Sequence, residues 1–171
     1  MAWKTLVIIA LGMLSVALVI SIVSCSIPYW VTTKQVGSSK VWMGLWKICF
    51  KQSGKLDCTQ IATSGWLKAV RAFVVLGIVA TMVSLVMTTL HLRAEQVLYP
   101  AVGAASSAAA WLFFVIAVAI YGGEMKFPNS GGHFSSGYYL AVLSDITCLV
   151  ATVLILVSWK SSRRGGYDVV P

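Results

Sequence analysis

Four long apolar stretches constrain this chain more than any other feature of its sequence. They span residues 6–29, 69–90, 99–121 and 138–159. A helix needs about 20 residues, at about 1.5 Å of rise each, to cross the roughly 30 Å hydrocarbon layer of a membrane. Each stretch has that length, and none has a polar face for water to cover. Only 11% of the residues are charged, against about 25% in soluble domains. The sequence therefore predicts four membrane-spanning helices rather than a soluble helical bundle.

The polar segments between these stretches define the topology. Four spans place segments 1–5, 91–98 and 160–171 on one side of the membrane, and loops 30–68 and 122–137 on the other. The first stretch is longer than the apolar core of about 7–15 residues in a secretory signal, so we interpret it as a retained span. We expect residues 1–171 to form a single four-span domain.

The orientation of this topology rests on two observations that disagree. The positive-inside rule places lysine and arginine in the cytoplasm. Five basic residues lie on the side of the chain ends, yet eight lie on the side of the loops when Arg71, at the outer end of the second stretch, is counted. Cys49 and Cys58 lie in the longer loop, and disulfides persist on the oxidising side of a membrane. We give more weight to the cysteines and to the basic cluster directly after the fourth stretch. We therefore expect a multi-pass plasma membrane protein with both termini cytoplasmic.

The loop 30–68 has the composition of a small β-sheet. Residues 31–33 and 41–50 are rich in β-branched and aromatic side chains, which favour strands. Ser53-Gly54 predicts a tight turn, followed by a second arm at 55–61. A two-residue turn at that point pairs Cys49 directly with Cys58, close enough for a disulfide. Such a bond would stabilise a sheet with little core of its own, and two free thiols are the alternative. Cys25 and Cys148 lie in apolar stretches and are expected to be buried thiols.

The residues Trp30, Gly44-Leu45-Trp46, Cys49 and Cys58 form a pattern in the first loop of a four-span chain. This pattern resembles that of the claudin superfamily, which includes the peripheral myelin, epithelial membrane and lens fibre membrane intrinsic proteins. Arg71 matches a basic residue that the family often places at the mouth of the second helix. Segments 69–73, 117–121 and 134–138 look closest to the lens and epithelial branch.

The resemblance implies both a fold and a function. The fold is an all-α membrane four-helix bundle with a small antiparallel extracellular β-sheet, as in claudins. The function is that of a structural cell–cell adhesion or junction protein, which assembles laterally and across membranes through its extracellular β domain. The alternative is an accessory subunit that regulates the trafficking or gating of a channel or receptor.

Several side chains of the first loop are candidates for interaction. Trp30, Trp42 and Trp46 either hold the sheet at the membrane interface, or Trp42, Met43 and Leu45 form an exposed apolar lip that packs against a neighbouring molecule. The loop also has six lysines against one acidic residue, Asp57. This excess is either a solvated face or a surface for an acidic partner. The six are Lys34, Lys40, Lys47, Lys51, Lys55 and Lys68.

Asp145 and Arg71 are polar residues within apolar stretches. A charge inside a membrane normally faces the bundle and has a partner, so we predict that the two approach each other or share a polar network. The alternatives are a protonated Asp145, or an Arg71 that bonds to loop carbonyls. Small residues at four-residue spacing in 101–110 predict close contact with another helix of the same bundle rather than a dimer face.

No motif for catalysis is evident in the sequence. It has no nucleophile–base pair, phosphate-binding loop, metal-ligand cluster or dinucleotide fingerprint. We therefore expect no enzyme activity, no catalytic or metal-binding residues and no cofactor. The expected partners are the lipid bilayer, further copies of the chain and a second membrane protein, with no nucleic acid.

The predicted orientation can be tested in cells. We expect an antibody against a C-terminal epitope tag to bind only after the plasma membrane is permeabilised, because both termini are placed in the cytoplasm. An impermeant amine reagent should label the loop lysines without permeabilisation. Staining of the tag on intact cells would reverse the orientation.

Overall fold

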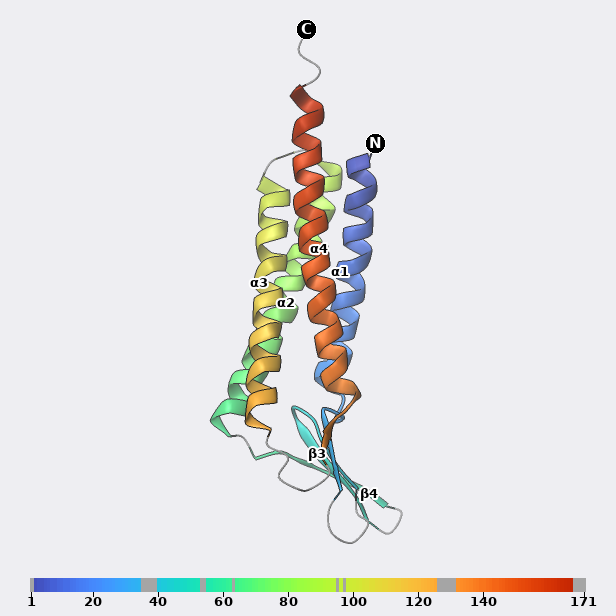
Figure 1. Cartoon of the computed structure of the whole chain (residues 1–171), viewed down its shortest axis with the longest axis vertical. Coiled ribbons are helices and arrows are strands. Elements are labelled where there is room, and N and C mark those ends of the chain that lie inside the picture. Colours follow the sequence, from blue (N-terminus) through green and yellow to red (C-terminus); the bar gives the residue numbers. More distant parts are fainter. Residues whose placement is uncertain are drawn as a thin grey trace.

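The computed structural model describes residues 2–34, 40–52, 55–62, 64–94, 96, 98–125 and 132–167. Within them lie four long helices: α1 (Ala2–Ser26), α2 (Gly65–Arg93), α3 (Leu98–Glu124) and α4 (Ser136–Tyr167). All four are long and apolar enough to cross a membrane. They stand side by side, with the start of α1 and the end of α4 at one end and a small sheet at the other (Figure 1). The predicted four-span architecture is confirmed, and α2, α3 and α4 extend beyond both ends of their apolar stretches. α1 starts before its predicted stretch of 6–29 but ends at Ser26, ahead of Pro28.

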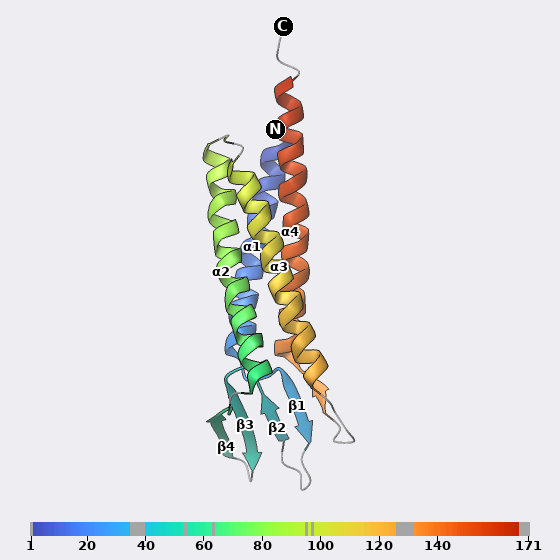
Figure 2. The same ribbon diagram turned by 90° about the vertical axis from the view of Figure 1, so that its left-hand side faces the viewer.

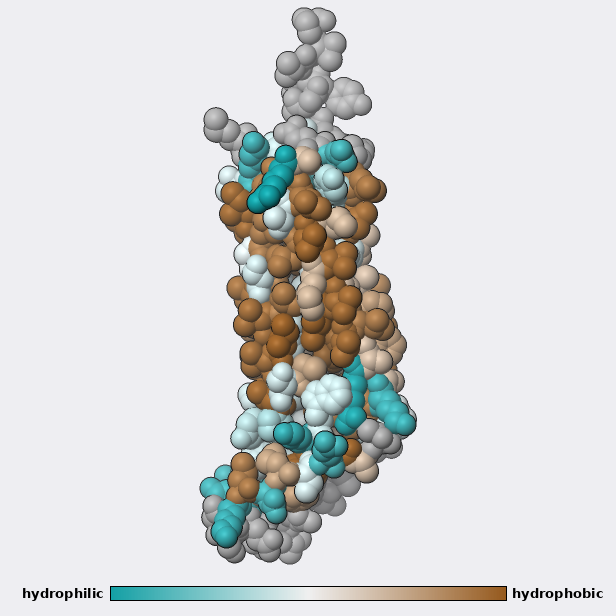
Figure 3. Space-filling model, turned by 180° about the vertical axis from the view of Figure 1, so that it is seen from behind, coloured by the Kyte–Doolittle hydropathy of each residue, from teal (hydrophilic) through white to brown (hydrophobic). Residues whose placement is uncertain are grey.

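The outer surface of the bundle is more apolar than that of a soluble protein. Large hydrophobic side chains are exposed along every helix, among them Ile8, Val19, Val86, Ile146 and Val153. On the face drawn in Figure 3 they form a continuous belt between hydrophilic ends. Lipid solvates such a belt, whereas all backbone polar groups within it are satisfied inside the helices.

The buried residues of each helix recur at alternating spacings of three and four. In α2 they are Leu67, Val70, Val74, Gly77, Thr81, Ser84, Thr88 and His91. The same alternation runs through the buried positions of α1, α3 and α4. This heptad spacing produces left-handed packing of nearly parallel or antiparallel helices. α2 packs against α3 and α1, and α4 packs against α1 and α3.

Small and hydroxylated side chains fill this interior and bind one helix to the next. Ser84 Oγ donates to the carbonyl of Gly103 at 2.8 Å, and Ser144 Oγ donates to the carbonyl of Ala17 at 2.9 Å. Hydrogen bonds between helices and close backbone approach replace the hydrophobic effect, which does not act between helices in lipid. The predicted contact of segment 101–110 within the bundle is confirmed by the burial of its small residues and by the bond from Ser84.

The sheet has five antiparallel strands in the order β4-β3-β2-β1-β5 (Figure 2). They are β1 (Val31–Lys34), β2 (Lys40–Met43), β3 (Lys47–Gln52), β4 (Lys55–Gln60) and β5 (His133–Phe134). The stretch 41–50, whose composition favours strands, contributes to two of them, because the chain turns at Gly44–Trp46 between β2 and β3. β5 was not predicted, since it is only two residues long and carries no strand pattern of its own.

The hairpin of β3 and β4 has the predicted register. Cys49 lies directly opposite Cys58 and forms a disulfide with it, with 4.1 Å between the two Cα atoms. The expected turn at Ser53-Gly54 lies outside the described residues. The other two cysteines are free thiols, and Cys148 is buried as expected, whereas Cys25 is only partly buried.

The close contact of α2 with α3 gives a testable prediction. A Cβ atom added at Gly77 would lie 2.8 Å from the ring of Phe114. We therefore expect Gly77→Leu to destabilise the protein by about 1–3 kcal/mol, measured as a lower midpoint of thermal unfolding in detergent. Gly12→Leu is the matched control, because a Cβ at Gly12 meets nothing within 4 Å. Equal midpoints for the two variants would contradict this packing.

Candidate functional site

The joint between the sheet and the bundle is a cluster of buried side chains, and Trp30 lies at its centre. Trp30 follows the end of α1 and is completely buried. Its indole N–H donates to the carbonyl of Ser24 at 2.7 Å. Its backbone N–H donates to Met43, and its carbonyl accepts from Ser135, both at 2.9 Å. One residue thus connects α1, β2 and the segment that leads into α4.

Aromatic rings surround the indole of Trp30. The ring of Tyr121, at the end of α3, meets it edge-on with centroids 4.8 Å apart, and that of Tyr138 lies at 6.2 Å. Gly137 packs against the same indole, since a Cβ there would lie 2.7 Å from its Cδ1. The sequence analysis did not assign these contacts. The available signal was the two tyrosines at the ends of predicted spans, where amphipathic rings commonly lie.

Gly44, Leu45 and Trp46 form the turn between β2 and β3. The N–H of Gly44 donates to the carbonyl of Lys47 at 3.0 Å, which reverses the chain. A Cβ on Gly44 would lie 2.5 Å from the Cα of Pro28, so only glycine allows this close approach. The turn directs Leu45 into the core, where it is completely buried.

Arg71 holds this turn from α2. Its Nε–H donates to the carbonyl of Leu45 at 2.7 Å. Its guanidinium lies 4.8 Å from the centre of the Trp46 ring, a cation–π arrangement. The indole N–H of Trp46 in turn donates to the carbonyl of Cys25 at 2.9 Å. The contacts therefore run from α1 through the turn to α2 and fix the sheet to the end of the bundle.

The predicted approach of Arg71 to Asp145 is not observed, and the alternative bond from Arg71 to a loop carbonyl is. The described residues contain no ion pair between the two side chains. The reason is helix arrangement, because α2 and α4 each pack chiefly against α1 and α3. One oxygen of Asp145, Oδ1, is buried and has no hydrogen-bond partner in the described part of the chain.

The predicted apolar lip is wrong for Leu45, which the turn buries. Met43 is partly buried and packs against the core. Trp42 is also partly buried, and its ring meets that of Tyr29 with centroids 6.0 Å apart. Trp46 is 42% exposed. Trp30 and Trp46 hold the sheet to the end of the bundle through contacts inside the protein, and contact of these rings with the membrane interface stays a prediction.

The lysines of the sheet are aligned across neighbouring strands. Lys40 pairs with Lys34 on one side and with Lys51 on the other. The side chains of Lys40 and Lys51 are exposed, and that of Lys34 lies outside the described residues. Like charges in directly opposed positions destabilise a sheet. The alignment therefore suits contact with acidic groups, although a solvated face remains the alternative.

β4 forms an open edge of the sheet. All of its described side chains are exposed, and Leu56 is 56% exposed. No strand covers its outer side in the described structure, because β4 ends the strand order. An exposed edge offers backbone donors and acceptors to the strand of another molecule. Within the described residues, no three histidine, cysteine, aspartate or glutamate side chains lie close enough together to hold a metal ion.

These features define a class of protein: a four-span membrane protein that carries a disulfide-bonded antiparallel sheet on one end of its bundle. The chain belongs to the PMP-22/EMP/MP20/Claudin family, whose pattern matches residues 4–162. It is also similar to the claudin-like protein ZF-A89 of Danio rerio, with 35% identity over 77 residues. That similarity covers 39% of this chain and only 37% of the relative. The resemblance inferred from the motif is thus confirmed for the family.

The role of Arg71 in holding the sheet can be tested by Arg71→Lys. Lysine keeps the charge but loses the planar donor that both stacks on Trp46 and bonds Leu45. We expect backbone hydrogen exchange in β3 to accelerate about tenfold, the change that corresponds to about 1.4 kcal/mol of local stability. Arg93→Lys, at the opposite end of α2, should leave this exchange unchanged. Equal exchange in both variants would show that Arg71 does not hold the turn.

Proposed function

We propose that this chain is a structural adhesion or junction protein of the plasma membrane. It assembles side by side in one membrane and makes contact across the intercellular gap through its sheet. Its sheet faces outward and both termini face the cytoplasm. This orientation is supported by the disulfide of Cys49 and Cys58, since such bonds persist in oxidising compartments.

The observation that carries this proposal is an attached, disulfide-bonded sheet with an open edge. Trp30 and Arg71 fix the sheet to the bundle, and the disulfide joins its outer hairpin. β4 is left fully exposed on the side away from β3. A preorganised edge can add a strand from a neighbour with little loss of conformational entropy. Lateral assembly of identical chains uses this edge.

The contact across the gap depends on the charge of the sheet. The aligned lysines 34, 40 and 51 repel the same row on an identical opposed molecule. We infer that the row meets acidic groups on the opposing surface instead, and that salt weakens this contact over a Debye length of about 8 Å.

Segments 69–73, 117–121 and 134–138 support a place in the lens and epithelial branch of the family.

A second candidate function is that of an accessory subunit of a channel or receptor. The observation that favours it is the buried oxygen Oδ1 of Asp145, which lacks a hydrogen-bond partner in the described structure. Asp145 as a whole is only partly buried, so a rotation of its side chain would let a basic or hydroxylated residue in a membrane helix of another protein reach this carboxyl group. Under this alternative α4, rather than β4, is the docking element.

Clustering of vesicles tests the leading proposal. We expect vesicles of anionic lipid that carry the purified protein to cluster, because the lysines on one vesicle can meet the acidic head groups of the next. We also expect the protein to migrate as an oligomer in mild detergent. Leu56→Lys places a positive charge on the open edge. It should abolish the oligomer, because charged side chains on an edge strand oppose the addition of a strand from another molecule. Leu98 has a similar exposure, 63%, but lies at the opposite end of the bundle from the sheet. Leu98→Lys should therefore leave the oligomer unchanged.

Two other outcomes would overturn the adhesion proposal. One is a monomer that never clusters vesicles. The other is the copurification of a different membrane protein from native membrane in a fixed ratio. If Asp145→Leu abolishes this copurification, the accessory role is established.

A further inference from the structure

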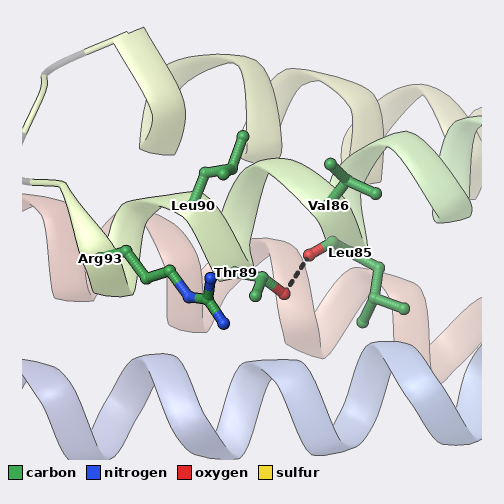
Figure 4. Close-up of a pocket in the computed structure, with 5 residues that line it drawn as sticks. All are labelled: Leu85, Val86, Thr89, Leu90 and Arg93. Carbon is green, nitrogen blue, oxygen red and sulfur yellow. Dashed lines mark hydrogen bonds between the residues drawn. The ribbon is translucent and has the colours of Figure 1, made fainter.

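The outer face of α2 carries two shallow apolar grooves with basic rims. The larger has a volume of about 520 Å³ and lies beside the sheet, where it is lined by Trp46, Lys68, Arg71, Ala72, Val75 and Leu76. The smaller has a volume of about 280 Å³ and lies at the opposite end of the helix. There Arg93 reaches back along the helix towards Thr89 and supplies the only basic group of that lining (Figure 4).

The rim of the larger groove carries positive charge that the described part of the protein does not balance. Lys68 and Arg71 are three residues apart on α2 and therefore share a face, where like charges repel each other. Neither forms an ion pair with a carboxylate in the described structure, and the first turn of α2 has no acidic residue. Arg71 uses its Nε–H on Leu45. Its two terminal amino groups donate to no acceptor among the described residues.

The floor of the same groove is apolar and continues into the membrane belt. Val75 is 45% exposed and Leu76 is 47% exposed, and Ala72 lies between them and the basic rim. The indole of Trp46 forms one wall. A soluble anion would contact the rim alone, and an apolar helix of another protein would leave two cations unpaired. A molecule with an anionic head and an apolar tail satisfies both parts of the groove.

We propose that this groove binds one anionic phospholipid. Its phosphate accepts hydrogen bonds from Lys68 and from the terminal amino groups of Arg71, and such charge-assisted bonds are among the stronger ones in proteins. One acyl chain lies along Ala72, Val75 and Leu76. The lipid thereby contacts the same arginine that holds the Gly44–Trp46 turn. This inference depends neither on the orientation of the protein nor on its role in adhesion.

Lipid retention tests the proposal on the full-length protein. The protein is reconstituted into vesicles of equimolar phosphatidylserine and phosphatidylcholine, extracted into mild detergent, washed extensively and analysed for bound lipid by mass spectrometry. We expect phosphatidylserine to be enriched over phosphatidylcholine and retained at one molecule per chain. Lys68→Gln should weaken its retention about tenfold through the loss of one charge-assisted bond. Ala72→Trp should reduce it similarly by filling the groove while keeping both charges.

Two control variants separate this site from general boundary lipid. Arg93→Gln removes one positive charge from the smaller groove, and Val79→Trp adds the same bulk to an exposed position of α2 outside the lining. Both should retain phosphatidylserine as the unmodified protein does. The proposal is overturned by equal losses in these controls, or by retention without enrichment. It is also overturned if Ala72→Trp dissociates an oligomer without changing bound lipid, which would make the groove an interface between copies of the chain.

Discussion

The burial of Trp30 is the interaction on which the arrangement of the molecule depends. A sheet of short strands has too little apolar surface to be stable alone, and here its core is shared with the end of the bundle. The indole contacts Tyr121 from α3 and Tyr138 from α4, and bonds to Ser24 of α1. Because Gly137 packs against the same ring, the start of α4 and the position of the sheet are fixed together. The position of β4 relative to the bundle therefore depends on this joint, through the strands that connect them.

The helical bundle exposes many large hydrophobic side chains, because lipid rather than water surrounds it. Large hydrophobic residues are also buried inside it, and the buried polar residues of the described chain, except His91, are serines and threonines. Helices that gain nothing from excluding water must gain from close contact, which explains why Gly77 meets Phe114 and Ser84 bonds to Gly103. The same logic makes Asp145 unusual. Thr88 and Tyr121 also have a buried polar atom without a hydrogen-bond partner in the described structure, but Asp145 is the carboxyl group among the three, and a carboxyl group favours a basic or hydroxylated partner within the membrane.

The family motif has a structural explanation in these contacts. Trp30, Gly44, Leu45, Trp46 and Arg71 all belong to the joint, and none of them lies on the open edge. Gly44 is required for close approach to Pro28, and Arg71 unites a hydrogen bond to Leu45 with a stacking contact on Trp46. The motif residues therefore attach the sheet to the bundle. The proposed contacts with other molecules are made elsewhere, by β4, by the aligned lysines and by the groove beside Lys68.

The sequence by itself determined the four spans, the β-rich loop and the pairing of Cys49 with Cys58. Span length, residue type and hairpin register are local properties, and each can be read from neighbouring positions in the chain. Only the tertiary structure decided that Leu45 points inward, that Arg71 bonds its carbonyl rather than Asp145, and that β5 joins the sheet. These outcomes depend on the rotation of each helix and on which helices are neighbours. Both are set by packing between residues far apart in the chain, such as Trp30 with Tyr121, and no short stretch of sequence contains that information.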